Sequence, residues 1–295
     1  MPSLKDIKLR IASIKNTQKT TRAMKMVSAS KLRRAQDRAI KLRPYAKKLQ
    51  EVLQRVLAAV GDEAVQNPYT EARTPEKVLV VLVTSNKGLA GQFNMAIIRM
   101  ALAHVEAQYS AQLAAGTVSF LCIGRKGYDF LRARNYTLVG ENHDAFSHLS
   151  ADYVGELAEY LADGFLEGTW DRIDLAYNEF RTMLAQDRRV EQFLPFDLST
   201  TTQASGGAAT DYLYEPEREE ILASVLPLVL KLRLFRAVLE SNSAEHAARM
   251  IAMDNATENA QDLLGALRLS YNKARQAAIT KELIEIVSGA EALNG

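Results

Sequence analysis

The sequence predicts a long antiparallel coiled coil, formed by helices at the two ends of the chain, with a small α/β domain inserted between them. Two observations indicate the coiled coil. Apolar residues recur in a three-four repeat in both terminal segments, and proline and glycine are scarce there. A third observation indicates the insert, where short β-branched runs alternate with helical patterns. Of the 295 residues, 47% are hydrophobic and 24% are charged, which excludes a mainly disordered chain.

The first predicted helix occupies residues 1–62. Its repeat starts at Leu4 and passes through 17 positions to Val60, of which 13 are apolar. The four polar positions are consecutive, and they are Gln18, Thr21, Lys25 and Ser28. A 3.5-residue period held over this length is typical of a coiled-coil seam. Such a helix would extend roughly 85 Å, and Ser3 with Asp6 is suited to cap its start.

The second predicted helix occupies residues 211–290 and carries the same kind of repeat. Its positions are Ile221, Val225, Leu228, Leu232, Phe235, Leu239, Asn242, His246, Arg249, Met253, Ala256, Ala260, Leu263, Leu267, Ser270, Ala274, Ala277, Lys281 and Ile284. One long helix at each end of a chain, with a globular insert between, implies that the two helices run antiparallel. Small residues on both repeats would let the two backbones approach closely.

The middle of the chain, residues 76–198, is predicted to be a Rossmann-like α/β domain with a mostly parallel sheet. The expected strands are Val78–Val83, Val118–Ile123, Ile173–Phe180 and Val190–Phe196, and the expected helices are residues 93–113, a short one from Lys126, and Asp152–Phe165. The first strand is apolar throughout, as expected of a strand buried on both faces. Residues 199–210 are small and polar and indicate a linker back into the last helix.

No residue pattern in the chain indicates an active site, a cofactor or a metal. Glycines follow the first and second strands, in Thr84–Gly91 and Ile123–Gly127, but they lack the spacing of phosphate-binding loops. We therefore interpret them as turn and packing residues. The four histidines are widely scattered, and Cys122 lies inside an apolar strand, where a buried unreactive thiol is expected.

The charge of the chain is strongly divided. Residues 1–48 hold 15 Lys or Arg against two Asp, so they carry +13, and the other residues carry −11. Two interpretations compete: a basic helix that grips nucleic-acid phosphates, or one that runs along an acidic protein surface. The four polar seam positions are equally open to two explanations. They fix the register of the helix pair, or they mark where a third partner surrounds it.

Several segments resemble the gamma chain of the rotary F-type ATP synthase. They are Lys15–Arg34 (KNTQKTTRAMKMVSASKLRR), Thr84–Asn94, Ile123–Gly127, Asp211–Glu217 (DYLYEPE), Glu245–Met253 (EHAARMIAM) and Tyr271–Gly289 (YNKARQAAITKELIEIVSG). The resemblance covers both terminal helices nearly completely and the middle in pattern.

The resemblance implies a central rotor shaft without catalytic residues of its own and without cofactors. Its expected partners are the ring of alternating alpha and beta subunits, the epsilon subunit and the membrane-embedded c-subunit ring. Rotation of the shaft would drive the catalytic beta subunits through their nucleotide states. The expected location is peripheral, on the cytoplasmic face of a bacterial inner membrane or the matrix side in an organelle. The alternative remains a basic coiled-coil module that binds nucleic acid.

The resemblance also implies particular contact residues. Those expected to face the beta subunits are Met24, Lys25, Arg275, Thr280, Lys281 and Glu282. Those expected at the foot, near the membrane ring and the epsilon subunit, are Tyr212, Tyr214 and Glu215. Lys281 departs from the glutamine that some members of the family have at this position, so its contact is expected to differ.

Overall fold

The structure is a computed structural model, and it describes residues 3–60, 67–140, 149–197 and 218–294. These residues divide into two compact units. The first, the helix-pair unit, consists of Met1–Ala29 and Arg249–Gly295, and the second, the α/β unit, consists of Ser30–Ala248. The predicted linker at 199–210 lies outside the described residues, as do the foot residues Tyr212, Tyr214 and Glu215.

Two long helices, α1 (Leu4–Val60) and α7 (Arg218–Asn294), each contribute to both units. In the helix-pair unit they pack antiparallel, since residues that come later in α1 contact residues that come earlier in α7. The expected cap is present at the start of α1, where the Asp6 backbone N–H donates to Ser3 Oγ at 3.2 Å. The predicted coiled coil is therefore confirmed.

The repeat predicted for α1 matches its buried face. No position of that repeat from Leu4 to Val56 is fully exposed, and Ile7, Leu32 and Leu53 are buried. Ala35 is also buried, with only 3% of its surface exposed. Hydrophobic periodicity alone thus located the face of α1 that packs.

Beyond Ala260, the repeat predicted for α7 is wrong at every second position as far as Ala277. Leu263, Ser270 and Ala277 are exposed, while Leu264 is buried and Tyr271 and Ala278 are half-buried in their place. The two alternative repeats differ by one residue at these positions. Because Leu263 and Leu264 are both leucine, composition does not distinguish the two repeats, and packing against α1 decides.

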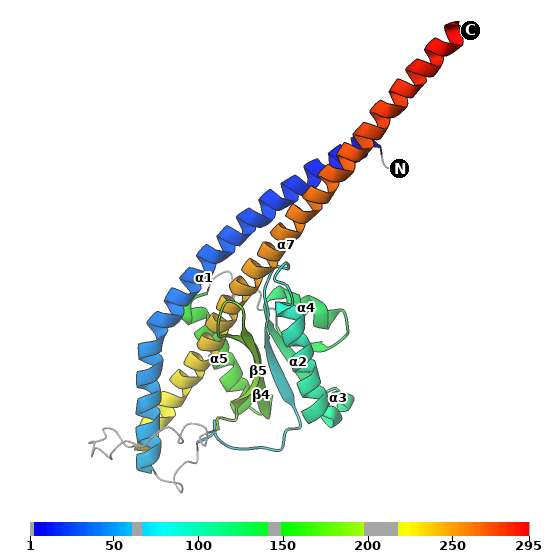
Figure 1. The fold of residues 1–295 in the computed structure, drawn as a ribbon. Helices are drawn as coiled ribbons and strands as arrows, with labels where there is room; N and C mark the ends of the chain where they lie inside the picture. The colour runs from blue at the N-terminus through cyan, green and yellow to red at the C-terminus, as the bar shows by residue number, and fades with distance from the viewer. Residues whose placement is uncertain (1–2, 61–66, 141–148, 198–217, 295) are drawn as a thin grey trace. The chain divides into compact units, whose positions relative to one another are not determined.

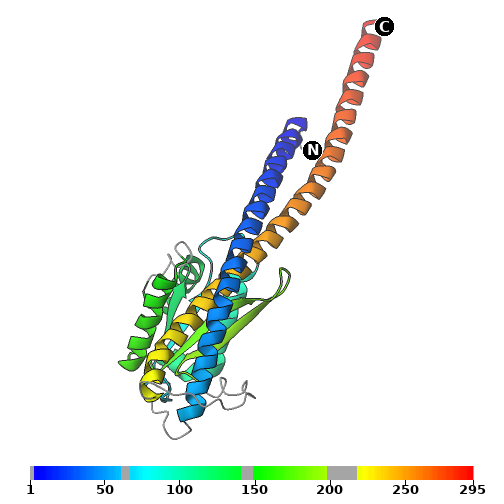
Figure 2. The ribbon, with the colours of Figure 1, turned by 90° about the vertical axis from the view of Figure 1, so that its left-hand side faces the viewer.

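The last part of α7 has no helix of the helix-pair unit beside it. Residues Thr280 to Ala290 are all exposed, including the predicted repeat positions Lys281 and Ile284. Figures 1 and 2 both show α7 continuing past the start of α1. The predicted repeat fails here because α1, which begins at Leu4, does not extend alongside this segment.

The α/β unit contains a five-stranded sheet in the order β3-β2-β1-β4-β5. The strands are β1 (Val78–Val83), β2 (Val118–Ile123), β3 (Thr137–Leu138), β4 (Arg172–Phe180) and β5 (Gln186–Leu194). Strands β1 to β4 run parallel, and β5 pairs antiparallel with β4. The mostly parallel sheet is confirmed. The two-residue β3 was not predicted, and β5 begins four residues earlier than predicted because its first half is polar.

Helices cover both faces of the sheet (Figure 1). They are α2 (Phe93–Gln108), α3 (Ser110–Ala115), α4 (Arg125–Arg132) and α5 (Ala151–Leu166). Alternate residues of β1 enter two separate cores. Val78, Val80 and Leu82 pack with α2 and α4. Leu79, Val81 and Val83 pack with α5 and with the parts of α1 and α7 in this unit. Every β1 side chain is buried, which explains its unbroken apolar sequence.

The glycines after β2 have the turn and packing role that the sequence indicated. Gly124, at the end of β2, has φ +107°, and a Cβ there would lie 1.9 Å from the Thr84 carbonyl oxygen. A Cβ at Gly127 would lie 2.9 Å from Thr84 Oγ1. Cys122 is buried in β2, and burial raises the pKa of its thiol to about 12, which keeps it protonated and unreactive at neutral pH.

We predict that Gly124→Ala destabilises the α/β unit by about 3 kcal/mol or more. The added methyl group must displace the backbone of Thr84, and the alanine must also adopt a positive φ. Gly116→Ala is the matched control, since Gly116 has φ +72° but open space around it. The control should cost only about 1–2 kcal/mol. Urea unfolding measures the free energy of unfolding of both variants. Equal losses in the two variants would contradict the close approach of Gly124 to Thr84.

Candidate functional site

The most distinctive site in the helix-pair unit is a row of polar contacts between α1 and α7, which we call the polar ladder. Gln18 Nε2 donates to Gln261 Oε1 at 2.5 Å. The hydroxyls of Thr21 and Thr257 lie 2.8 Å apart. These residues sit three or four apart on both helices, so each pair stacks one turn above the next.

The third rung of the polar ladder is an ion pair. Lys25 Nζ donates to Asp254 Oδ1 at 2.5 Å, and the two side chains are 40% and 43% exposed. An ion pair this exposed contributes less than about 1 kcal/mol. Its value lies in matching one residue of α1 to one residue of α7, which penalises a shifted register.

The hydroxyls of Ser28 and of the polar-ladder residue Thr257 donate within their own helices. Ser28 Oγ donates to the Met24 carbonyl at 2.8 Å, and Thr257 Oγ1 donates to the Met253 carbonyl at 2.7 Å. The polar stretch of α1 therefore makes defined contacts inside the helix pair. Contacts with α7 favour register as the explanation for Gln18, Thr21 and Lys25, whereas Ser28 bonds only within α1. The sequence carried a signal that we missed, since Asp254, Thr257 and Gln261 repeat the same spacing on α7.

The outward surface of the helix-pair unit carries many large apolar side chains. On α1 the side chains of Leu9, Met26 and Val27 are more than half exposed. On the last part of α7 the exposed apolar side chains are Leu269, Ile279, Leu283, Ile284, Ile286 and Val287. Apolar side chains gathered in this number on a surface are typical of a protein interface.

The predicted contact residues fall into two groups in the structure. Met24 is half-buried in the helix pair, next to Lys25 of the polar ladder. The other four are exposed on α7: Arg275, Thr280, Lys281 and Glu282. Thr280 Oγ1 donates to the Gln276 carbonyl at 2.9 Å, and Lys281 lies 3.6 Å from Glu285. The structure does not bring the two groups together, and their partner contacts stay predictions.

A buried carboxylate in the α/β unit was not found from sequence. Asp174 Oδ2 accepts from the Tyr109 hydroxyl at 2.7 Å and lies 2.9 Å from His104 Nε2, while Oδ1 accepts from Arg172 Nε at 3.1 Å. Burial and the hydrogen bond to Asp174 raise the pKa of Tyr109. The partners lie up to 70 residues apart in sequence, and no spacing rule joins them. All the contacts hold the Asp174 carboxylate within the fold, which indicates a structural role.

Among the described residues, no three His, Cys, Asp or Glu side chains gather as a metal site would require. Two of the four histidines, His143 and His148, lie outside the described ranges. Within the described ranges, no helix combines the length and the apolar character needed to cross a bilayer.

The fold and these sites define the class of protein as a paired-helix subunit that carries a parallel α/β domain and presents protein-binding surfaces. The ATP synthase family matches residues 3–293 of this chain. Proteins named ATP synthase gamma chain are similar over the full length: the one from Cytophaga hutchinsonii is 48% identical, covering 100% of both chains, and the one from Chlorobaculum parvum is 49% identical, covering 99% of both. The chain belongs to the ATP synthase gamma chain family.

Solved structures support the fold. A chain from the Euglena gracilis mitochondrial ATP synthase, in a structure of OSCP, F1 and the c-ring, is 21% identical with a TM-score of 0.65, covering 98% of this chain and 94% of that one. A chain from the Tetrahymena thermophila central stalk and c-ring is 24% identical with a TM-score of 0.56, covering 80% and 99%. The alternative of a nucleic-acid-binding module finds no support in these comparisons.

We predict that Lys25→Glu loosens the helix pair, because it places two carboxylates at one rung of the polar ladder. The charge-swapped variant, Lys25→Glu with Asp254→Lys, should recover most of the loss. Lys25→Glu is expected to lower the stability of the helix pair by at most about 1 kcal/mol. Hydrogen exchange at the amides around Thr21 and Thr257 measures it. Additive effects of the two substitutions, without recovery, would show that the rung contributes nothing.

Proposed function

We propose that this chain is the central rotor shaft of a proton-translocating ATP synthase. In this role it couples rotation of a membrane ring to conformational changes in catalytic beta subunits. The single observation that carries the proposal is its full-length similarity to proteins named ATP synthase gamma chain. The exposed apolar end of α7 supports it, because a shaft tip enclosed by other subunits needs such a surface.

The basic first helix fits a shaft that touches acidic surfaces while it turns. Its +13 charge is spread along residues 1–48 and is not concentrated at one point. Spread charge attracts an oppositely charged surface without one deep, fixed contact. We propose that Met24, Lys25, Arg275, Thr280, Lys281 and Glu282 contact the beta subunits of the alpha-beta ring.

The other end of the shaft would carry the contacts to the membrane sector. We propose that Tyr212, Tyr214 and Glu215 lie at this foot, near the epsilon subunit and the c-subunit ring. The chain would then be a peripheral membrane protein, held at the cytoplasmic face of a bacterial membrane, or the matrix side in an organelle, through its complex. The domain limits proposed for these roles are 1–62 and 211–290 for the shaft, 76–198 for the α/β domain and 199–210 for the linker.

We further propose that the chain is not itself an enzyme and that nucleotide chemistry belongs to the beta subunits. Three features support this. Gly124 and Gly127, which follow β2, are packed against Thr84, the single cysteine has a buried, protonated thiol, and the buried Asp174 is held by side chains of the α/β unit.

The proposal predicts that reversing surface charge on the shaft changes coupled ATPase turnover. The test variant is Arg275→Glu combined with the charge swap Lys25→Glu and Asp254→Lys, which keeps the internal rung paired. When assembled with the alpha and beta subunits, it should change turnover by at least about twofold. The isolated chain should keep its helical circular dichroism and should hydrolyse no ATP.

The matched control is Arg99→Glu, an exposed arginine on α2 of the α/β unit. It should leave turnover unchanged. Unchanged turnover in the test variant would count against the contact residues, and failure of the chain to assemble with alpha and beta subunits would overturn the rotor proposal. Salt-dependent binding of generic duplex DNA by the chain, without assembly, would instead revive the nucleic-acid alternative.

A further inference from the structure

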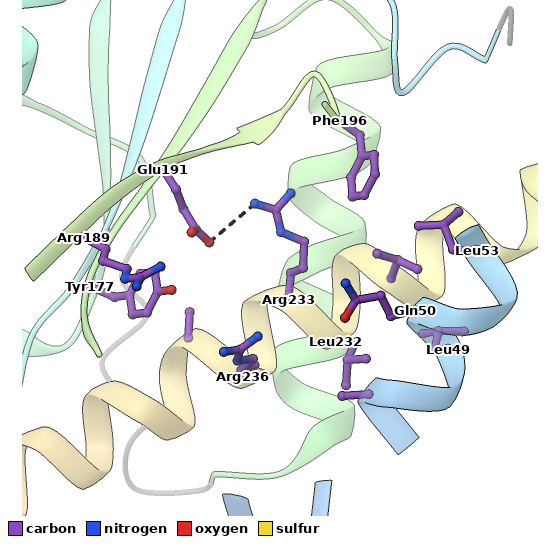
Figure 3. A pocket seen from close by; sticks show the side chains of 13 residues that line it. Leu49, Gln50, Leu53, Tyr177, Arg189, Glu191, Phe196, Leu232, Arg233 and Arg236 are labelled. Carbon is purple, nitrogen blue, oxygen red and sulfur yellow. Dashed lines mark hydrogen bonds and ion pairs between the residues drawn. The ribbon is translucent and has the colours of Figure 1, made fainter. Parts of the chain in front are cut away.

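A pocket of about 240 Å³ beside α7 in the α/β unit has balanced charges. Figure 3 shows Arg189, Arg233 and Arg236 on its polar side, together with Glu191. Arg233 lies 3.4 Å from Glu191, and Arg189 Nε lies 2.6 Å from Glu179 Oε2. Because carboxylates match these partly exposed guanidinium groups, the pocket favours neither an anion nor a cation.

A larger groove, of about 540 Å³, lies between α1, α5 and α7 of the same unit, and we call it the α5 groove. Its lining is largely apolar. Leu42, Leu232 and Phe235 line it and are half-buried. Tyr45 and Leu228, which also line it, are 54% and 43% exposed. Apolar side chains left open to solvent on three adjoining helices are typical of a binding surface.

The charged residues that line the α5 groove are mostly acidic. Asp152, Glu156 and Glu159 come from α5, and Lys231 on α7 is the one cation among the described lining residues. Lys231 donates to Glu159, so its charge is already paired. Asp152 and Glu156 are exposed and form no ion pair with any residue in the described ranges. The groove therefore keeps two carboxylates open to a partner.

The sequence around α5 has charges of one sign only. Residues 135–171 contain eight Asp or Glu and no Lys or Arg, in a chain whose net charge is +2. Within α5 the acidic residues recur at positions 152, 156, 159 and 163, which is the spacing of one helix face. A face of one sign attracts a basic partner and repels an acidic one.

A glycine keeps the α5 groove open between α5 and α7. Gly155 is buried inside α5, where glycine destabilises a helix relative to alanine. A Cβ there would meet only Lys231 Cδ, at the ordinary contact distance of 3.8 Å. Packing explains the other glycine of α5, since a Cβ at Gly164 would lie 2.2 Å from Trp170. Packing does not explain Gly155, where a larger side chain would narrow the groove.

We propose that the α5 groove docks a basic amphipathic helix of a partner protein. The apolar side chains of that helix would lie against Leu42, Leu232 and Phe235, and its Lys or Arg side chains would pair with Asp152 and Glu156. Helices that bind grooves anchor in this way, through apolar residues three or four positions apart. A small cation would leave the apolar lining open, and an acidic helix would be repelled.

The α5 groove uses none of the residues proposed to contact the beta subunits or to form the foot. All of its lining residues belong to the α/β unit, so a docked helix would bind one compact unit. Failure of this docking would leave the rotor proposal untouched, and loss of the rotor role would leave the groove as it is.

The test measures binding of a fluorescently labelled peptide, KLAKLAKKLAKLAK, to the full-length chain by fluorescence anisotropy. One control peptide replaces each leucine by serine, which keeps the charge and removes the apolar face. A second control replaces each lysine by glutamate, which keeps the apolar face and reverses the charge. We expect saturable binding of the first peptide, and at least about tenfold weaker binding of both controls.

Two pairs of variants assign the binding to the α5 groove. Glu156→Lys should weaken it at least about fivefold, whereas Glu106→Lys, at an exposed position on α2, should leave it unchanged. Gly155→Leu fills the groove and should weaken binding similarly, whereas Gly265→Leu, at an open position on α7 outside the groove, should not. Both glycine variants should fold, because leucine favours a helix more than glycine does.

Three results would overturn the proposal. Equal binding of the lysine-leucine peptide and its serine control would show charge attraction without an apolar docking groove. Unchanged binding by Glu156→Lys or by Gly155→Leu would place the peptide elsewhere on the chain. Self-association of the chain that Glu156→Lys abolishes would assign the groove to a second copy of this chain.

Discussion

The antiparallel pairing of α1 with α7 is the constraint on which the other features of this protein depend. It brings the two terminal helices side by side, so the segment between them must leave the helix pair and return to it. A parallel sheet suits this requirement because its crossovers are helices that can cover both faces. The same two helices also supply core residues to the α/β unit, where Leu53 and Leu226 belong to one apolar cluster. In the helix-pair unit the contact between α1 and α7 is instead partly polar. The apolar contact in the α/β unit stabilises the fold, whereas the polar contact in the helix-pair unit defines the register of the two helices.

The polar ladder explains why a coiled coil would give up apolar seam positions. An apolar seam tolerates sliding by whole repeats, since one leucine can replace another. Paired glutamines, paired threonines and a lysine with an aspartate match only in one alignment. Alignment matters for a shaft, because a slipped pair would misplace every side chain on its surface. The exposed apolar end of α7 then presents a fixed set of side chains to whatever encloses it.

Sequence reasoning located the elements whose signal is local and failed where the signal is not. The buried strand Val78–Val83 and the repeat of α1 were predicted because burial leaves a clear apolar pattern. The predicted repeat of α7 was wrong by one residue in part of the helix. Leu263 and Leu264 have the same side chain, and only packing against α1 determines which of them is buried. The polar start of β5 carried no strand signal, because its register comes from pairing with β4. The contact of Tyr109 with Asp174 joins residues far apart in sequence, and no local pattern encodes it. The partners of Gln18 and Thr21 had a signal in the matching spacing of polar residues on α7, but that spacing alone does not pair one residue with another.

The most direct test of the account asks whether the helix pair works as one unit. Thr21→Cys and Thr257→Cys place a thiol on each helix where the hydroxyls lie 2.8 Å apart, and the native Cys122 is buried and does not interfere. ATPase turnover is then measured in the assembled complex before and after oxidation. The account predicts that a disulfide forms readily and that the bridged complex keeps its turnover, because the helices stay paired while the shaft works. Turnover lost on oxidation and restored by reductant would show that the helices must separate, and would contradict it.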